Sequence, residues 1–264
     1  MRQTLTAVWR LLRATLHVLH GMVVMTRFPA LDAVARHERI RWWSAGLVRA
    51  MGLTLQVSGT PRPGATMIVA NHISWLDIAA IHAAAPHARF VSKADVLSWP
   101  LLGWLIRNAG TLFIQRERKR DAVRVVHAVA EALNAGDTVA VFPEGTTGTG
   151  PELLPFHANL LQAAVATATP VQPVVLRFSD AGGPFSPAVT FIGETTLLQS
   201  LWRVASAQGL AVSVELLPAV GTRHADRRAL AAHLHELVSD RLSESVHRAA
   251  PMAKPGVRSA KLPQ

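Results

Sequence analysis

The chain of 264 residues contains no cysteine, so disulfides, thiolate metal sites and a cysteine nucleophile are excluded. Tyrosine is also absent, and charged residues make up only 17% of a chain that is 50% hydrophobic. Acidic residues are scarce: 17 Asp and Glu stand against 27 Lys and Arg, which gives a net charge of +10. A chain of this length can bury one large core. Its cationic excess favours an anionic partner, either a nucleic acid or a membrane surface.

The N-terminal stretch lacks a run long enough to cross a bilayer. Its longest uncharged run, residues 14–26, is shorter than the roughly 20 residues that a spanning helix needs, and it lacks a small-residue cleavage site. We therefore expect neither a spanning helix nor a removed signal peptide there. Residues 4–27 instead have the pattern of an amphipathic helix, with apolar residues on one face and a polar stripe on the other. The stripe contains Thr6, Arg10, Arg13, His17 and His20.

This pattern favours a helix that lies in a membrane surface, although packing on the protein's own core would produce a similar one. Pro29 ends the helix and residues 32–52 form a second one, so residues 1–60 are predicted to be a membrane-associating helix pair. Eight arginines lie in this part, together with Trp9, Trp42 and Trp43. Trp beside Arg is typical of the lipid headgroup boundary, and the chain contains no zinc-finger, basic-zipper or RNA-binding motif. We therefore expect a membrane bilayer as partner, and no nucleic acid.

The remainder of the chain alternates between strands and helices after a boundary at residues 61–64, which contain two prolines and a glycine. Strands are predicted at residues 67–70, 90–92, 111–115, 138–142, 171–178, 187–192 and 210–217. Helices are predicted at residues 74–85, 100–108, 119–135, 158–168, 197–206 and 225–248. This alternation predicts an α/β domain over residues 61–250, with a central, mostly parallel sheet and helices on both faces. A basic tail at residues 251–264 is predicted to be disordered.

A possible catalytic pair follows the first strand of this domain. The apolar residues 68–70 lead into Asn71 and His72, and Asp77 comes five residues after the histidine. Within one helix, residues at this spacing point about 140° apart, so the two side chains meet only if His72 lies in the turn and Asp77 in the first helical turn. Ser74 is a suitable N-cap for that helix. Ser74 and Asp77 also have the spacing of a capping box, which would explain Asp77 without catalysis.

Two further stretches place polar residues after strands. Residues 110–116 end in Arg116, which either meets an anion at the rim of the sheet or belongs to a solvated charged turn. Residues 141–148 run from a buried strand into a turn that contains Glu144, Gly145 and Thr146. The amides and hydroxyls of such a turn suit a polar headgroup, and the alternative is a purely structural turn. Farther along the chain, residues 169–176 contain a strand start with two flanking prolines.

These four stretches, in this order and spacing, resemble the glycerolipid acyltransferase family and its 1-acylglycerol-3-phosphate acyltransferases. The family motifs Asn-His-x4-Asp, Gly-x2-Phe-x-x-Arg and Phe-Pro-Glu-Gly-Thr match residues 71–77, 110–116 and 142–146, and a proline-flanked strand follows. The resemblance covers residues 65–180, including Lys93 and residues 97–103. The N-terminal helix pair also resembles the membrane platform of this family.

The resemblance implies transfer of a fatty acyl group from a thioester to the free hydroxyl of a lysophospholipid, with 1-acylglycerol-3-phosphate as acceptor and phosphatidic acid as product. His72 would be the general base, and Asp77 would orient its imidazole. Lys93 and Arg116 would hold the acceptor phosphate. The donor would be acyl-CoA or acyl-carrier protein, without a cofactor or metal, at the cytoplasmic face of a membrane. The residues that would shape the acceptor site are Glu144, Gly145 and Thr146.

The chain departs from the family pattern at Thr147, where many members have an arginine that resembles a phosphate ligand. This opens the alternative of a lyso-ornithine lipid acceptor, which lacks that phosphate. A lipid hydrolase would need a nucleophile, and Ser74 lies close to His72 although no Gly-x-Ser-x-Gly elbow is present. A non-catalytic basic membrane-binding protein would explain the N-terminal helices but not the motifs. A metal site at His72, Asp77 and His82 is not expected, because their spacing does not place them on one face.

Overall fold

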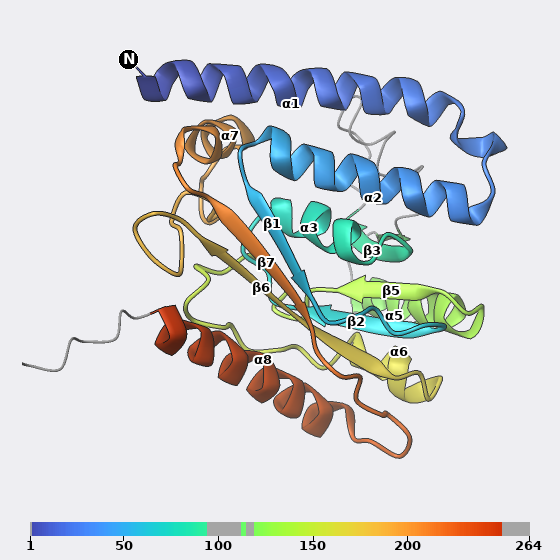
Figure 1. Cartoon of the computed structure of the whole chain (residues 1–264). Coiled ribbons are helices and arrows are strands. Elements are labelled where there is room, and N and C mark those ends of the chain that lie inside the picture. Colours follow the sequence, from blue (N-terminus) through green and yellow to red (C-terminus); the bar gives the residue numbers. More distant parts are fainter. Residues whose placement is uncertain (1, 94–111, 115–118, 250–264) are drawn as a thin grey trace, which may run out of the picture.

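The computed structural model describes residues 2–93, 112–114 and 119–249 of the chain, and a seven-stranded sheet lies at the centre of this part (Figure 1). The strand order across the sheet is β1-β7-β6-β2-β5-β3-β4. The strands are β1 (Thr54–Ser58), β2 (Thr66–Ala70), β3 (Ala88–Lys93), β4 (Leu112–Ile114), β5 (Thr138–Val141), β6 (Val171–Ser179) and β7 (Ala211–Leu216).

Most neighbouring strands in this sheet run parallel. Strands β6, β2, β5, β3 and β4 are parallel to one another, β7 is antiparallel to β6, and β1 is parallel to β7. Every residue of β2 is buried, as expected for the middle of a sheet that is covered on both faces. The predicted α/β fold with a mostly parallel sheet is therefore confirmed.

Helices cover both faces of the sheet (Figure 1). One face carries α1 (Arg2–Thr26), α2 (Ala33–Ala50), α3 (Leu76–Ala84) and α7 (Leu197–Ser206). The other carries α5 (Lys119–Asn134), α6 (Leu161–Ala166) and α8 (Arg227–Ala249). The short 3-10 helix η1 (Phe28–Ala30) joins α1 to α2, at the position where Pro29 was predicted to end the first helix. Each face has its own large apolar core, so the sheet separates two layers of packing.

Two parts of the predicted strand pattern differ from the structure. Residues 187–192 form a loop and not a strand, because Pro187 has no N–H and the N–H of Phe191 bonds to the carbonyl of Ile73 instead of to a neighbouring strand. Strand β1 was not predicted, since most of its residues are exposed and it lacks an apolar run. It lies before the predicted boundary at residue 61, yet it forms an edge of the sheet. The helix predicted at 100–108 and the tail at 251–264 lie outside the described residues.

Helix α1 packs on the rest of the protein through small side chains. Ala7, Ala14 and Gly21 recur every seven residues, face inward and are buried. Two members of the predicted polar stripe also face inward. Arg10 donates to the carbonyls of Ala205 and Ala207 at the end of α7, and His17 donates through Nε2 to the carbonyl of Trp43 at 2.8 Å. The polar stripe is thus partly used for packing on α2 and α7.

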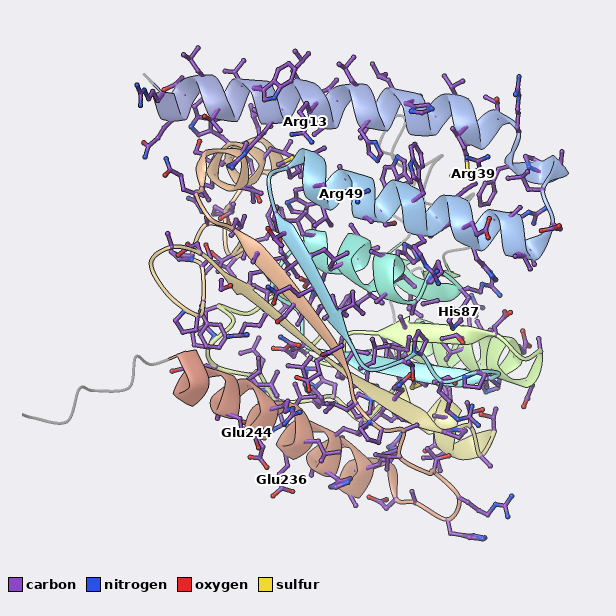
Figure 2. All side chains as sticks on the ribbon, viewed as in Figure 1. Arg13, Arg39, Arg49, His87, Glu236 and Glu244 are labelled. Carbon is purple, nitrogen blue, oxygen red and sulfur yellow. The ribbon has the colours of Figure 1, made fainter. Side chains whose placement is uncertain are left out.

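The outward face of α1 is apolar. Figure 2 shows a row of side chains that project from this face, away from the rest of the molecule. Its exposed large hydrophobic residues are Leu5, Val8, Trp9, Leu12, Leu16, Leu19 and Val23. Among the helices of the described residues, none is long and apolar enough to cross a membrane.

Candidate active site

Asn71 fixes the point at which the chain leaves β2. Its side-chain amide donates to the carbonyl of Leu176 at 2.9 Å, and its carbonyl accepts from the N–H of Leu176 at 2.8 Å. Asn71 is buried, and the pair of bonds joins the end of β2 to β6 as a further backbone pair would. The next residue, His72, begins the turn of residues 72–75, called the catalytic turn because His72 is the predicted general base. The turn starts from a fixed position at the carboxyl edge of the sheet, where open α/β folds bind their ligands.

His72 and Asp77 are in direct contact. Nδ1 of His72 lies 2.7 Å from Oδ2 of Asp77, and the Asp77 side chain is fully buried whereas the His72 side chain is 20% exposed. A carboxylate only accepts hydrogen bonds, so Nδ1 carries the proton and Nε2 of the neutral ring has the lone pair. The ring also stacks on Phe142, with centroids 4.0 Å apart and planes 11° from parallel. Two contacts thus fix a ring that solvent still reaches, as a general base requires.

The local fold that joins the pair is the predicted one. His72 lies in the turn, α3 begins at Leu76, and Asp77 occupies the first helical turn. Oδ2 of Asp77 accepts from the backbone N–H groups of Ile73 at 2.6 Å and Ser74 at 2.9 Å, in addition to His72. One carboxylate oxygen therefore holds the backbone of the turn and orients the imidazole, so a structural role and a catalytic role of Asp77 are compatible. Of the predicted capping box, only the bond from the N–H of Ser74 to Asp77 is present.

The prediction that the Ser74 side chain caps α3 is wrong. Its hydroxyl is buried and has no hydrogen-bond partner among the residues that the structure describes, because the N–H of Asp77 donates to the backbone carbonyl of Ser74 at 3.1 Å and not to its hydroxyl. The same geometry bears on the hydrolase alternative. No hydrogen bond to His72 activates the Ser74 hydroxyl, and burial keeps it from a substrate.

Glu144 is tied to the backbone of the catalytic turn. Its Oε1 accepts from the N–H of His72 at 2.6 Å, and its Oε2 accepts from the N–H of Leu154 at 2.9 Å. The residue is buried, and burial raises the pKa of the Glu144 carboxyl, whereas the two N–H bonds oppose that rise. Both oxygens are occupied, so Glu144 positions His72 and does not present a free carboxylate to the acceptor.

Gly145 and Thr146 follow on the surface. The backbone of Gly145 has φ +72°, in the left-handed region that favours glycine, and both residues are exposed. A Cβ atom at Gly145 would lie 3.4 Å from Cδ2 of His157, an exposed residue whose N–H donates to the carbonyl of Pro143 at 2.9 Å. Sequence reasoning missed His157, because no motif contains it and only the fold brings it to this turn.

Thr147 holds two loops together. Its hydroxyl donates to the carbonyl of Phe191, and the N–H of Phe191 donates to the carbonyl of Ile73 at 3.2 Å. The side chain that replaces the expected arginine thus ties the loop before α7 to the catalytic turn. Lys93 ends β3, but nothing of its side chain is described, and Arg116 lies outside the described residues.

His82 belongs to the core. Its Nε2 donates to the carbonyl of Ala88 at 2.9 Å, and its ring meets Phe90 edge-on. Burial lowers the pKa of His82 to about 4, so the ring is neutral at pH 7. His82 is therefore hydrogen-bonded within the core of the protein, away from the metal site with His72 and Asp77 that was not expected from the sequence.

The chain is similar to known acyltransferases. A family profile described as Acyltransferase matches residues 55–177. A lyso-ornithine lipid O-acyltransferase from Pseudomonas aeruginosa is 38% identical over 213 residues, which cover 80% of this chain and 81% of that protein. A 1-acyl-sn-glycerol-3-phosphate acyltransferase from Neisseria meningitidis serogroup B is 36% identical over 208 residues, which cover 77% of this chain and 80% of that protein.

A solved structure shares the fold. It is the 1-acyl-sn-glycerophosphate (LPA) acyltransferase PlsC from Thermotoga maritima, which matches with a TM-score of 0.70 and 22% identity over 92% of this chain and 95% of that one. The matched profile spans the catalytic turn and the Glu144 turn, and the curated relatives match over most of their length. The chain therefore belongs to the acyltransferase family.

Proposed function

We propose that the protein transfers a fatty acyl group from a thioester to the free hydroxyl of a lysolipid, with His72 as general base. The observation that carries this proposal is the 2.7 Å contact between Nδ1 of His72 and Asp77, which leaves the lone pair on Nε2. No hydrogen bond joins Nε2 to another residue within the described ranges. A lysolipid hydroxyl at hydrogen-bond distance from Nε2 would find a ready proton acceptor.

The reaction then needs no covalent enzyme intermediate. Nε2 takes the hydroxyl proton as the oxygen attacks the thioester carbonyl carbon, and the carbonyl π electrons move to its oxygen. Collapse of the tetrahedral intermediate breaks the carbon–sulfur bond, and the imidazolium returns the proton to the leaving thiolate. Asp77 stabilises the imidazolium between the two steps, which is the role of the carboxylate in a serine triad. The donor is acyl-CoA or acyl-carrier protein, and no cofactor takes part.

The first candidate acceptor is 1-acylglycerol-3-phosphate, which would give phosphatidic acid. In support, Lys93 is the last residue of β3 and pairs in register with Ile114, the last residue of the parallel strand β4, and Arg116 follows Ile114 by two positions in the sequence. The carboxyl ends of parallel strands meet at one edge, which is also the edge of His72. The second candidate is a lyso-ornithine lipid. Thr147 favours it, because its hydroxyl bonds to Phe191 where a phosphate-binding arginine was expected.

An acceptor panel tests this function. Purified protein would be offered 1-acylglycerol-3-phosphate, lyso-ornithine lipid and other lysolipids, each with acyl-CoA and with acyl-carrier protein. We expect one of the two named acceptors to be acylated at least about tenfold faster than the others, since one charge-assisted headgroup contact contributes roughly 1.5–3 kcal/mol. Absence of acylation with every donor and acceptor, by a protein that is folded and bound to vesicles, would leave only the membrane-binding alternative.

The outward face of α1 is proposed to lie in the cytoplasmic surface of a membrane, where thioester donors occur. Leu12 and Leu16 are 48% and 56% exposed, Arg13 lies exposed on the same helix and Arg27 directly after its end, which suits anionic headgroups. The double variant Leu12→Glu/Leu16→Glu should fail to sediment with vesicles that contain phosphatidylglycerol. Val123→Glu, on the opposite side of the sheet and 58% exposed, is the matched control.

A further inference from the structure

Helix α7 exposes large apolar side chains beside α1. Leu198 is 76% exposed and Trp202 is 44% exposed. Helix α7 is far along the sequence from the N-terminal helix pair. Together with Ala205, these residues are spaced by four and three positions, so they share one edge of the helix. Ala205 is buried, and Arg10 of α1 donates to its carbonyl at 2.9 Å. The apolar edge of α7 therefore runs toward the contact between α7 and α1.

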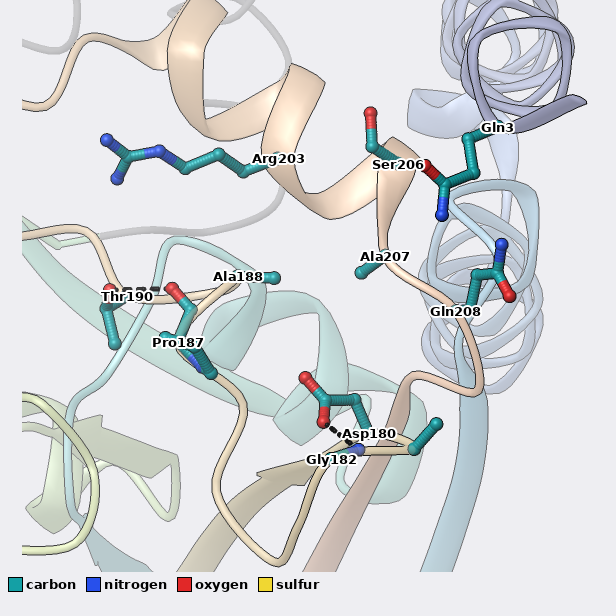
Figure 3. Close-up of a pocket in the computed structure, with 11 residues that line it drawn as sticks. Gln3, Asp180, Gly182, Pro187, Ala188, Thr190, Arg203, Ser206, Ala207 and Gln208 are labelled. Atoms are coloured by element: carbon teal, nitrogen blue, oxygen red, sulfur yellow. Dashed lines mark hydrogen bonds between the residues drawn. The ribbon is translucent and has the colours of Figure 1, made fainter. Parts of the chain in front are cut away.

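A hollow with apolar and polar lining residues borders this surface. It has a volume of about 760 Å³ and lies between the first turn of α1, the end of α7 and the loop after β6 (Figure 3). Figure 3 shows Gln3 and Gln208 on one side of the hollow and Arg203 on the other. The structure gives Arg203 no ion pair with any residue it describes. The Asp180 carboxylate also lines the hollow, where it accepts from the N–H of Gly182 and the hydroxyl of Ser186. Amide and guanidinium donors at the border of an apolar surface suit the phosphate groups of lipids.

The buried side of α7 is bonded to the catalytic turn. Ser200 is fully buried, and its hydroxyl accepts from the indole N–H of Trp75 at 3.0 Å. Trp75 lies between the turn and Asp77 in the sequence. The loop before α7 makes a second link, because the N–H of Phe191 donates to the carbonyl of Ile73. A movement of α7 would therefore displace Ile73 and Trp75, which follow His72 in the turn.

We infer that α7 is a second membrane-contacting helix, which places Leu198 and Trp202 in the bilayer surface that receives α1 and holds the catalytic turn beside that surface. Helix α2 lies beneath α1, and Ser44, Leu47, Val48 and Ala50 in its second half are buried. The inference rests on the membrane contact of α1 in the proposed function, and it explains how a lipid hydroxyl reaches His72 without leaving the membrane.

Fluorescence of single-cysteine variants tests the inference, because the chain has no cysteine of its own. Full-length Leu198→Cys, Leu12→Cys and Val123→Cys would each carry an environment-sensitive dye and meet vesicles of phosphatidylcholine and phosphatidylglycerol. We expect a blue shift of emission at positions 198 and 12 and none at 123. A shift at 12 without one at 198 would overturn the inference and leave the proposed function standing. The absence of a shift at both positions would overturn the inference and also the membrane contact of α1. The acyl-transfer assay measures catalysis independently of this result.

Vesicle affinity gives a second readout. The double variant Leu198→Gln/Trp202→Gln should bind these vesicles about tenfold more weakly, as expected when two apolar side chains no longer enter the bilayer. Val123→Gln should bind as the unmodified protein does. Circular dichroism would establish that both variants are folded. Equal affinity of the folded double variant and the unmodified protein would contradict a role for α7 at the membrane.

Discussion

The backbone N–H of His72 donates a 2.6 Å hydrogen bond to Oε1 of Glu144, a residue 72 positions away in the chain. Glu144→Gln can keep only one of its two backbone partners, since the new amide nitrogen is a donor that faces another donor. We expect a loss of about 1–3 kcal/mol in the free energy of unfolding, and a lower kcat because His72 loses its anchor. Urea denaturation and steady-state kinetics would measure these effects, and a variant with unchanged stability and kcat would refute the anchoring role.

The pKa of Glu144 gives a prediction of its own. Burial raises this pKa above the ordinary value of 4.5, so the folded state binds the proton more tightly than the unfolded state. As pH rises from 4.5 through the raised pKa, this group therefore lowers the free energy of unfolding. Glu144→Gln should lack that part of the pH dependence. Matching slopes for the variant and the unmodified protein over this range would contradict the prediction.

Substitution of either His72 or Asp77 should lower kcat. His72→Ala removes the proton acceptor, and we expect kcat to fall by about 10²–10⁴-fold, the range that general base catalysis supplies. Asp77→Asn keeps an acceptor for the turn but removes the charge that stabilises the imidazolium, so its kcat should fall comparably. His127→Ala, an exposed histidine on α5, is the control and should retain full activity. Substantial turnover by a folded His72→Ala variant would exclude His72 as the base.

His82 should make the protein sensitive to acid. Burial lowers its pKa to about 4 in the folded state, so between pH 6.5 and 4 the unfolded state binds more protons. The free energy of unfolding should then fall by roughly 3 kcal/mol as pH drops through this window, because one pKa unit corresponds to about 1.4 kcal/mol. The pKa values of His37 and His87 are also lowered, mainly by burial, and act in the same direction.

A comparison with His82→Gln isolates the contribution of His82. Glutamine keeps an N–H donor for the Ala88 carbonyl but does not titrate. Its denaturation midpoint should depend less steeply on pH between 4 and 6.5 than that of the unmodified protein. An equal pH dependence of the denaturation midpoint in both proteins would show that His82 does not cause the loss of stability in acid.

The headgroup preference should respond to Thr147. Thr147→Arg supplies the cation that the family pattern expects, and we predict that kcat/KM for 1-acylglycerol-3-phosphate relative to lyso-ornithine lipid rises by about tenfold. Thr147→Val removes only the hydroxyl that bonds to Phe191, so it should lower activity toward both acceptors alike. A ratio that is the same for the Arg and Val variants would show that position 147 does not contact the headgroup.

The sequence predicted the parts of the site that depend on local spacing. His72 and Asp77 meet across five positions, through a strand end, a turn and the start of a helix, each of which has its own sequence signal. The partners of Asn71 and Glu144 could not be predicted in this way. Asn71 bonds to Leu176, 105 positions away, and such a pairing follows only from the order of strands in the sheet.

The missed and wrong strands have a common physical reason. Strand β1 is mostly exposed at the edge of the sheet, so burial does not impose an apolar pattern on Thr54–Ser58. The stretch 187–192 contains apolar residues, but these pack as a loop over the catalytic turn. Local composition therefore misidentified both segments, since pairing with a distant strand decided their structure.

The position of β1 has a practical consequence for making a freely soluble form of the enzyme. Truncation before residue 61 would remove an edge strand together with Val48 and Met51, which are completely buried, and would bare the side of α3 that packs on α2. Polar replacements on the outward side of α1 would leave the inward seam of Ala7, Ala14 and Gly21 intact. Solubility is therefore better gained by exchanging exposed leucines than by shortening the chain.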